Sequence, residues 1–371
     1  MNSMERNSNF GRIITRLIQK ESLSRQEARH AFTMVLKDEV TEMQQGAFLA
    51  ALTAKGETGE EVAGAWEAIY ELDTEKVPLD GQGPVVENSG TGMDSFKTFN
   101  ISTAASLIAA SGGVKMARHG ARAITSKCGT LDLAEALGVD VECAAGVVAE
   151  SIERSGVGLF NGMSPLIHPN ALGRILSRIR FGSTLNIAAS LANPAMPRMG
   201  VRGVYAREMI LPVAGVMKAI GYKRALVMYG EVDDSDMGMD EASVCGTTHC
   251  AELTETGQIV TYSFRPSDLG MDTHDPSGLV PSDDLSQEAR SFTSLLQARL
   301  KGARADAAVL NGGLIFYVAG LSDTIGGGAR KASSILEGGG AFDTLRRWVI
   351  AQNRHPEEGR ERLERLVRFH A

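Results

Sequence analysis

The fold is decided by the stretch Val85-Val86-Glu87-Asn88-Ser89-Gly90-Thr91-Gly92-Met93-Asp94. The valines predict a strand that ends in Gly90-Thr91-Gly92, where glycines let the backbone approach a ligand and adopt positive φ. Successive N–H groups in such a turn can bind phosphate oxygens. A Gly-x-Gly turn alone also fits a tight structural turn, so the following residues must decide between the two interpretations.

A second anion-binding element follows a few residues later. Asn100-Ile101-Ser102-Thr103 precedes an alanine-rich segment with helical spacing. We expect Ser102 or Thr103 to cap this helix, whose N-terminus would then face an anion. A glycine turn and a helix N-terminus this close together could bind one diphosphate.

Basic residues follow the next apolar run. Arg118-His119-Gly120 would lie at the carboxyl end of a strand, where parallel sheets bind ligands. Arg118 could hold a phosphate with two hydrogen bonds. His119 could orient an acceptor or be an ordinary loop histidine, and both interpretations stay open. Arg122 and Lys127 add positive charge, and Gly129-Thr130 offers another turn with a hydroxyl group.

An acidic pair, Asp240-Glu241, lies further along the chain, preceded by Asp233, Asp234 and Asp236. Mg²⁺ prefers oxygen ligands and keeps several waters, so one or two carboxylates plus substrate phosphates suffice to bind it. These residues can also form a plain surface loop, and the acidic pair by itself does not separate the two cases.

Beyond Pro78, short apolar runs alternate with amphipathic segments, which predicts βαβ units and a mostly parallel sheet flanked by helices. The runs expected as strands are 85–86, 114–117, 139–141, 225–228, 259–262 and 307–310. The segments expected as helices are 102–111, 131–137 and 210–219.

The first eighty residues show helical spacing throughout, and Ser24 with Glu27 has the signature of a capping box. We therefore expect a small all-helical domain over residues 1–80, joined by helices from about 165–195. Residues 81–350 would form a larger α/β domain, and residues 351–371, dense in Arg and Glu, a C-terminal helical tail. The helical domain could serve for packing or for dimerisation.

Composition excludes several classes of protein. Hydrophobic residues make up 43% and charged residues 22% of the 371 positions, as in ordinary globular proteins. No run of about 18 apolar residues suggests a membrane span, and no signal peptide is apparent, so we expect a cytoplasmic protein. The net charge of −7 argues against a general nucleic-acid binder. Cys245, His249 and Cys250 lack the paired spacing of a structural zinc site.

Taken together, these segments resemble the anthranilate phosphoribosyltransferase family from about residue 10 to residue 350. Residues 90–94 are similar to that family's Gly-Thr-Gly-Gly-Asp motif, and residues 98–103, Thr-Phe-Asn-Ile-Ser-Thr, match its second donor-binding motif. Arg118-His119-Gly120 stands where the family has Lys-His-Gly. Residues 126–132 with 135–138 match the next loop and helix, and Gly238-Met239-Asp240-Glu241 matches the metal-binding pair.

The resemblance implies a phosphoribosyltransferase of tryptophan biosynthesis that uses Mg²⁺ and forms a homodimer through the helical domain. It implies that His119 and Arg178 face a small aromatic acceptor, with the arginine pairing with its carboxylate. It implies that Mg²⁺ is bound by Ser102, Asp240 and Glu241. Phosphoribosyl diphosphate would contact Gly90, Thr91, Gly92, Asp94, Thr98, Asn100, Ser102, Thr103, Arg118, Gly120 and Thr130.

The chain departs from the family pattern at several positions. Met93 replaces a glycine of the phosphate loop, which costs on the order of 1 kcal/mol if that position needs positive φ. Ala121 stands where the family has an acceptor-binding Asn, and Ala189-Ser190 where it usually has Gly-Pro. The donor half is therefore largely intact and the acceptor half altered. The position of Arg178 depends on aligning His168-Pro169, and a gap-free alignment shifts it by two residues.

Two other functions remain open at this point. A pyrimidine nucleoside or nucleotide phosphorylase is similar around residues 129–132, where Gly-Thr-Leu-Asp resembles a phosphate-binding motif. A non-catalytic relative that binds nucleic acid is the other alternative. The sequence does not identify the aromatic acceptor or the role of the C-terminal tail.

Overall fold

The chain begins with four helices, as the sequence predicts. The computed structural model describes residues 3–79, 82–120 and 129–368. The helices are α1 (Ser3–Ile18), α2 (Arg25–Leu36), α3 (Glu42–Lys55) and α4 (Gly59–Leu72). Ser24 caps α2: its hydroxyl accepts from the Glu27 N–H while the Glu27 carboxylate accepts from the Ser24 N–H. The predicted capping box is confirmed.

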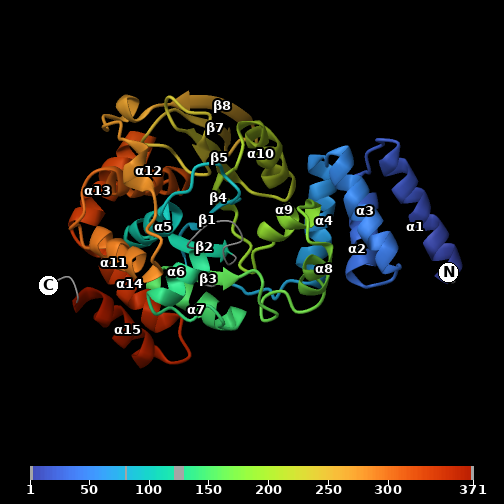
Figure 1. Ribbon diagram of the computed structural model, residues 1–371, viewed down its shortest axis with the longest axis horizontal. Helices are drawn as coiled ribbons and strands as arrows, with labels where there is room; N and C mark the ends of the chain where they lie inside the picture. The colour runs from blue at the N-terminus through green and yellow to red at the C-terminus, as the bar shows by residue number, and fades with distance from the viewer. Residues whose placement is uncertain (1–2, 80–81, 121–128, 369–371) are drawn as a thin grey trace.

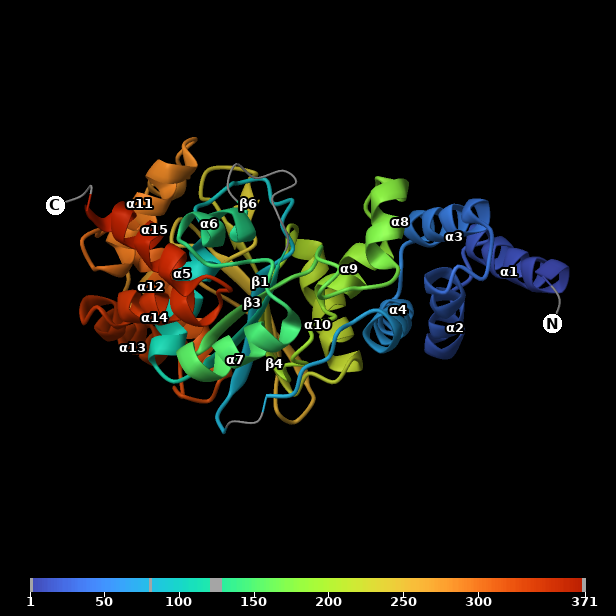
Figure 2. The same cartoon turned by 90° about the horizontal axis from the view of Figure 1, so that it is seen from below.

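The four N-terminal helices share one apolar core with two later helices, α8 (Leu172–Ile179) and α9 (Thr184–Ser190). Phe48 contacts both Phe10 and Phe32, with ring centroids 5.3 and 5.1 Å apart. The Trp66 indole N–H of α4 donates to the Leu191 carbonyl directly after α9. Figure 2 shows this helical part projecting to one side of the rest of the molecule. This bond ties α4 to the chain that leaves α9 toward the sheet.

The larger part of the chain is built on an eight-stranded sheet, with the strand order β3-β2-β1-β4-β5-β7-β8 and β6 paired with β5. The strands are β1 (Val85–Gly90), β2 (Lys115–Gly120), β3 (Val157–Asn161), β4 (Met199–Gly203), β5 (Arg224–Glu231), β6 (Gly238–Met239), β7 (Thr248–Leu253) and β8 (Ile259–Phe264). The first five pair in parallel and the remainder antiparallel. The predicted α/β class with a mostly parallel sheet is confirmed.

Helices cover both faces of this sheet (Figure 1). On one face lie α5 (Ile101–Ser111), α12 (Ala303–Val318), α13 (Ile325–Glu337) and α14 (Gly340–Ala351), which share a core with Val86, Met116 and Val201. On the other face, α10 (Ile210–Ala219) packs with the helical part, and α7 (Ala145–Ser155) packs below β2 and β3. Neighbouring residues of β1, β2 and β4 therefore point into different surroundings, since strand side chains alternate.

Two predicted strands are wrong. Residues 307–310 lie in α12, whose apolar residues surround the helix because it is buried against α5 and α13. An all-round apolar run carries no period that separates a helix from a buried strand. Residues 139–141 form a turn after α6 (Thr130–Ala136), where Val139 and Val141 fill the core without strand pairing. The sequence patterns do not predict β3, β4, β6 or β7.

The C-terminal segment packs on the α/β part. Helix α15 (Pro356–Arg368) follows α14 and contacts it, as well as α11 (Leu285–Leu296). Leu363 is buried, and Gly359 lies directly against the Gly138 carbonyl. Most polar residues of α15 are exposed, as its Arg and Glu content predicts. The two chain ends lie at opposite extremes of the molecule (Figure 1).

Candidate active site

The carboxyl ends of β1, β2 and β4 meet at one edge of the sheet, because these strands run parallel. They end at Gly90, Gly120 and Gly203. A side chain at Gly203 would place its Cβ 1.4 Å from the Asp240 carbonyl oxygen, and one at Gly90 would place it 2.1 Å from Asp240 Oδ2. Both positions therefore require glycine. The turn after β1 is packed directly on the acidic pair.

The glycine turn itself is hydrogen-bonded to that pair. Gly92 has φ 67°, and its N–H donates to Asp240 Oδ2 at 2.7 Å. The Thr91 N–H donates to the Gly203 carbonyl at 3.1 Å, which fixes the turn against β4. The position of the turn is thus coupled to the carboxylate of Asp240.

Met93 adopts the backbone conformation that its glycine counterpart would favour. Its φ is 65°, and its side chain is largely exposed. The expected need for positive φ at this position is confirmed. The left-handed conformation costs an L-residue about 1–2 kcal/mol, which few contacts of an exposed side chain can offset.

Met93→Gly should therefore raise the free energy of unfolding by on the order of 0.5 kcal/mol, since the relief of strain exceeds the extra entropy of glycine in the unfolded chain. Urea denaturation of the wild type, Met93→Gly and Met93→Ala measures the effect. Met93→Ala removes the side chain but keeps the strain, so it is the control. A glycine variant no more stable than the alanine variant would contradict the strain argument.

Three buried carboxylates converge beside the turn. One oxygen from each of Asp94, Asp240 and Glu241 lies within 4.8 Å of the others. Burial, followed by the charge of Asp240, raises the pKa of Asp94 to about 6, and the same two causes raise the pKa of Glu241. The Lys97 ammonium, 2.8 Å from Asp94, offsets only part of this negative charge. Buried like charges of this kind are stabilised by a bound cation.

Two hydroxyl groups, one in the first turn of α5 and one just before the helix, donate to one of these carboxylates. The Ser102 hydroxyl donates to Glu241 at 3.1 Å, and the Thr98 hydroxyl donates to its other oxygen at 3.5 Å. The expectation that Ser102 or Thr103 caps α5 is wrong, because the helix begins at Ile101 and Asn100 is its N-cap residue. Ser102 and Thr103 lie in the first turn. The oxygen donors gathered here suit a hard cation such as Mg²⁺.

Arg118 lies on the α5 face of β2. Its guanidinium donates to the Thr103 hydroxyl at 2.7 Å and to the Asn88 carbonyl at 3.2 Å. Burial lowers the pKa of Arg118 to about 10, and the nearby Glu241 opposes this effect. The group therefore remains a cation at neutral pH. Arg118 thus lies behind Thr103, the residue that follows Ser102 in the first turn of α5.

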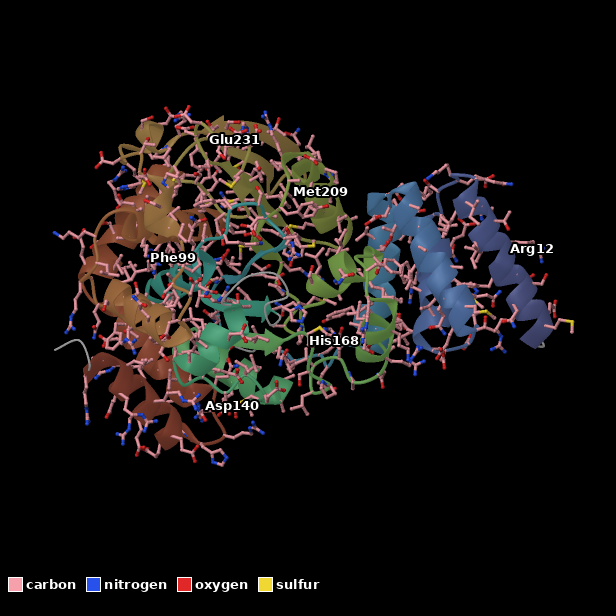
Figure 3. The ribbon with its side chains drawn as sticks, viewed as in Figure 1. Arg12, Phe99, Asp140, His168, Met209 and Glu231 are labelled. Atoms are coloured by element: carbon pink, nitrogen blue, oxygen red, sulfur yellow. The ribbon has the colours of Figure 1, made fainter. Side chains whose placement is uncertain are left out.

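His119 points to the opposite face, toward the helical part. Its Nε2 lies 3.3 Å from His168 Nε2, and its Nδ1 lies 3.5 Å from the Ser190 carbonyl. Figure 3 shows His168 at the junction between the sheet and the helices. Burial lowers the pKa of His119 to about 3, with the charge of His168 as the next cause. At neutral pH the ring is an uncharged donor and acceptor.

This burial predicts a pH dependence of stability. His119 has a folded pKa of about 3, below its ordinary value of 6.5, so the unfolded chain binds the proton first as the pH falls. Its contribution to stability is complete above about pH 6.5 and is lost toward pH 3, by up to about 1.4 kcal/mol per pH unit. Burial shifts the pKa of His168 in the same direction.

Urea denaturation between pH 7 and pH 5 measures this slope. His119→Gln should flatten it, whatever its effect on absolute stability, whereas the same change at the exposed His30 should not. Equal slopes for the wild type and His119→Gln would contradict the assignment of a neutral buried imidazole.

Arg178 is placed elsewhere. It lies on the outer surface of α8, and its guanidinium forms an ion pair with Glu42 of α3. Thr130 begins α6 and lies beside Gly120, so this pair does meet at the site edge. Ala121, Arg122, Lys127 and the rest of 121–128 lie outside the described residues. The structure therefore brings together the donor-side predictions but keeps Arg178 on the helical surface.

Several buried polar residues were missed by the sequence reasoning. Glu87 of β1 accepts from the Tyr222 hydroxyl and from Asn193 Nδ2. Arg202 of β4 is 3% exposed and donates to the Ser89 hydroxyl at 3.0 Å. The available signal was a charged residue inside each short apolar strand, but β4 itself was not predicted. Ser190, at the end of α9, contacts this arginine.

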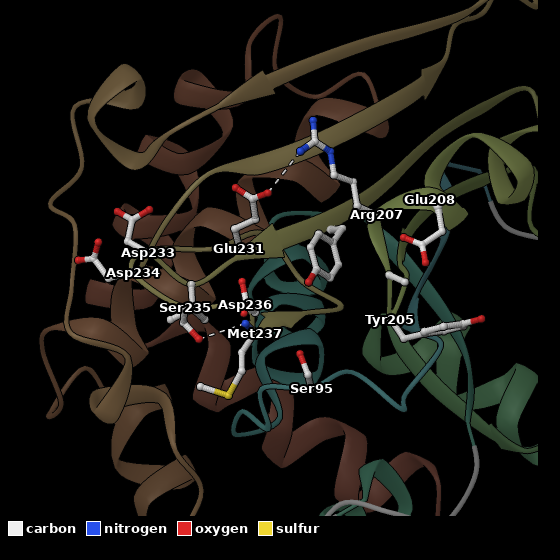
Figure 4. Close-up of a pocket in the computed structure, with 13 residues that line it drawn as sticks. Ser95, Tyr205, Arg207, Glu208, Glu231, Asp233, Asp234, Ser235, Asp236 and Met237 are labelled. Carbon is white, nitrogen blue, oxygen red and sulfur yellow. Dashed lines mark hydrogen bonds and ion pairs between the residues drawn. The ribbon is translucent and has the colours of Figure 1, made fainter.

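A pocket of about 590 Å³ lies next to the site, between Ser95 and the loop after β5 (Figure 4). Asp233, Asp234 and Asp236 line it together with Glu208 and Glu231, and Arg207 pairs with Glu231 at 3.5 Å. An acidic lining repels phosphate groups. The glycine turn and the start of α5 therefore suit phosphate groups better than this pocket does, and the acidic loop of residues 233–236 forms a separate surface.

None of the helices in the described ranges is both long and apolar enough to cross a membrane. Within the described ranges, one group of carboxylates could hold a metal ion, and it consists of Asp94, Asp240 and Glu241.

Comparisons with known proteins agree with this architecture. Residues 12–72 match the glycosyl transferase family helical bundle domain, and residues 82–342 match the glycosyl transferase family a/b domain. The chain is 36% identical over 340 residues to the anthranilate phosphoribosyltransferase of Anaeromyxobacter dehalogenans, covering 91% of this chain and 97% of that protein. It is 35% identical to the enzyme of Haloarcula marismortui, covering 90% and 97%.

Solved structures show the same fold. The crystal structure of anthranilate phosphoribosyltransferase from Thermus thermophilus superposes with a TM-score of 0.82 at 31% identity, covering 92% of this chain and 99% of that one. The Saccharomyces cerevisiae enzyme in complex with PRPP and Mg gives a TM-score of 0.79 at 21% identity, covering 93% and 98%. The second likeness concerns the fold alone.

Proposed function

The chain belongs to the anthranilate phosphoribosyltransferase family, and from this premise we propose that it transfers ribose 5-phosphate from phosphoribosyl diphosphate to anthranilate or a related aromatic carboxylate. One observation carries the proposal: the glycine turn is hydrogen-bonded to the carboxylate trio through Gly92 and Asp240. A diphosphate on the turn would thus lie next to a cation held by the carboxylates.

On this proposal the donor is bound by the turn and the start of α5. The backbone of residues 90–92 and the helix N-terminus would bind phosphate oxygens. Arg118, buried and cationic, would supply positive charge behind Thr103. The residues proposed to contact the donor are Gly90, Thr91, Gly92, Asp94, Thr98, Asn100, Ser102, Thr103, Arg118, Gly120 and Thr130.

Mg²⁺ would be held by Asp240, Glu241 and Ser102, and Asp94 lies close enough to take part. When bound, it would neutralise the charge of the departing diphosphate. The choice of Mg²⁺ rests on the oxygen donors gathered here, which a hard cation prefers.

The chemistry needs little from acid–base groups. The neutral amine of the acceptor attacks C1 of the ribose and the C1–N bond forms, while the C1–O bond breaks and its electron pair leaves with the diphosphate. The nitrogen then loses one proton, which the departing diphosphate or water takes up. The transition state resembles an oxocarbenium ion, as in glycoside hydrolysis. The protein's task is to hold the amine in line behind C1. His119, neutral and beside Ser190, is proposed to contact the acceptor.

A coupled assay tests the proposal. Diphosphate release from phosphoribosyl diphosphate, Mg²⁺ and anthranilate should be dependent on the acceptor and should stop with chelator. Product identity is checked by mass spectrometry. The absence of release with every member of a panel of aromatic carboxylates would overturn it.

Phosphorylase activity is the alternative. The carboxylate trio disfavours it, since free phosphate would meet three buried carboxyl groups without a diphosphate-bound cation. Phosphate-dependent base release from pyrimidine nucleosides, with no diphosphate release from the donor, would favour the phosphorylase. A nucleic-acid-binding role is disfavoured by the net charge of −7.

We further propose a homodimer formed through the helical domain of residues 1–80 and about 165–195. Ile18 and Met43 are exposed on α1 and α3, with 66% and 84% of their surface accessible. These two side chains lie toward opposite ends of the paired helices, since Lys20 donates to the Ala54 carbonyl and Gln44 to the Asn7 carbonyl, so the proposal rests on the family membership rather than on one apolar patch. Analytical ultracentrifugation tests this, and a single monomeric species at micromolar concentration would contradict it.

A further inference from the structure

Arg202 is a buried arginine without a carboxylate partner. It is 3% exposed, and its Nε has no hydrogen-bond partner among the residues that the structure describes. No ion pair joins it to any carboxylate in the described ranges. A guanidinium offers five donors, and burying one without an anion is costly. Such a group is expected where a ligand supplies the missing negative charge.

The two terminal nitrogens of Arg202 reach the edge of the site. Nη1 donates to the Ser89 hydroxyl at 3.0 Å, and Nη2 donates to the Ser190 hydroxyl at 2.5 Å. Ser89 stands opposite Arg202 in the parallel register of β1 and β4, immediately before Gly90. Both serines are half-buried, whereas the arginine is buried. The guanidinium is thus held by two half-buried serine hydroxyls, one of which immediately precedes the glycine turn.

An acidic residue on the same sheet face, Glu87, is committed to other partners. Glu87, on the same face of β1, accepts from the Tyr222 hydroxyl and from Asn193. Burial raises the pKa of Glu87, and the charge of Arg202 opposes this rise, so the two groups sense each other without contact. Glu87 therefore moderates the charge of Arg202 but leaves its hydrogen-bonding capacity open.

His119 borders the same spot and cannot supply the charge. Its Nδ1 lies 3.5 Å from the Ser190 carbonyl, and the ring is neutral at pH 7 because of burial. Arg178, expected from alignment to bind the acceptor, is paired with Glu42 on the outer surface of α8. Among the residues that the structure describes, Arg202 is thus a cation that stands close to Ser190, whose carbonyl lies near His119.

We propose that Arg202, with the hydroxyls of Ser89 and Ser190, binds the carboxylate of the aromatic acceptor and sets the preference for a carboxylated acceptor. The inference rests on the proposed transferase function. A planar guanidinium can donate two parallel N–H bonds to the two oxygens of a carboxylate, which fixes the geometry of the pair. The carboxylate would be held at the carboxyl end of β4, and the ring and its amine would extend past His119 toward the glycine turn.

The test compares Arg202→Met, Arg202→Lys and the control Arg198→Met, which removes an arginine just before the opposite end of the same strand. Each enzyme is assayed with anthranilate and with its neutral amide, 2-aminobenzamide, and the KM for phosphoribosyl diphosphate is measured. Arg202→Met should lose at least about 30-fold in kcat/KM for anthranilate, as expected when one partner of a buried charge pair is removed. It should change little for the amide.

Arg202→Lys should recover only part of the loss, because an ammonium lacks the paired donors. The donor KM should stay within about twofold in every variant, which also shows that the fold is intact. Ser190→Ala, a milder change, should reduce the preference for anthranilate in the same direction if the Met variant does not fold. An equal loss for both acceptors, or an unchanged preference, overturns the role of Arg202. If the wild type releases diphosphate with no aromatic carboxylate, the proposed function itself fails.

Discussion

Replacing Asp240 by Asn and Glu241 by Gln together is expected to lower kcat/KM by at least about 100-fold, or about 2.7 kcal/mol in transition-state free energy. The amides keep the shape of the site and can retain the oxygen that accepts from the Gly92 N–H. They remove the negative charge that would hold a cation beside the diphosphate. The measurement is the rate of diphosphate release over a range of Mg²⁺ concentrations.

The same variant separates metal binding from folding. In the wild type, burial and mutual repulsion raise the pKa of Glu241, so the carboxylates destabilise the metal-free protein. The double variant should therefore melt no lower than the wild type without Mg²⁺, and Mg²⁺ with donor should stabilise the wild type only. Asp236→Asn, in the neighbouring acidic loop, is the control and should keep wild-type activity. Full turnover of the double variant in chelator would refute the metal site.

Gly90→Ala is expected to reduce both stability and activity. The new methyl group would lie 2.1 Å from Asp240 Oδ2 and 2.5 Å from its Cγ, so either the turn or the carboxylate must move. Overpacking of this kind costs about 1–3 kcal/mol. Because Asp240 also bonds the Gly92 N–H, displacement of the carboxylate should disturb the anion-binding turn and the cation site together. We expect kcat/KM to fall by at least about tenfold.

The matched control is Gly146→Ala on α7, where an added Cβ meets no atom within 4 Å. That change should stabilise the protein by about 0.5–1 kcal/mol, since alanine is the better helix former. Thermal unfolding and the apparent affinity for Mg²⁺ with donor are measured for both variants. Wild-type Mg²⁺ affinity in Gly90→Ala would show that the turn and the carboxylates are not coupled.

Local patterns account for what the sequence predicted well. Helical spacing and the Ser24 cap depend on residues three or four positions apart, so the N-terminal helices could be read directly. The alternation of apolar runs with amphipathic segments gave the α/β class in the same way. It failed at residues 307–310, because a helix buried on all sides has no polar face to reveal its period.

The candidate site likewise has features that depend on local sequence and features that depend on tertiary packing. The sequence by itself determined which chemical groups are available: a glycine turn, hydroxyls at the start of a helix, basic residues after a strand, and an acidic pair. Only the tertiary structure decided that Gly92 touches Asp240, 148 positions away, and that Arg118 and His119 face opposite sides of β2. It also placed Arg178 on the outer helical surface and Arg202 beside Ser89 and Ser190.

The physical reason is that hydrogen bonding and periodicity within an element depend on neighbours in the chain, whereas the order and register of strands depend on long-range packing. A charged residue in a short strand, such as Arg202, can be assigned a face only once its neighbouring strands are known. The local sequence therefore determines which chemical groups are available, and the order of the strands brings these groups together at one edge of the sheet.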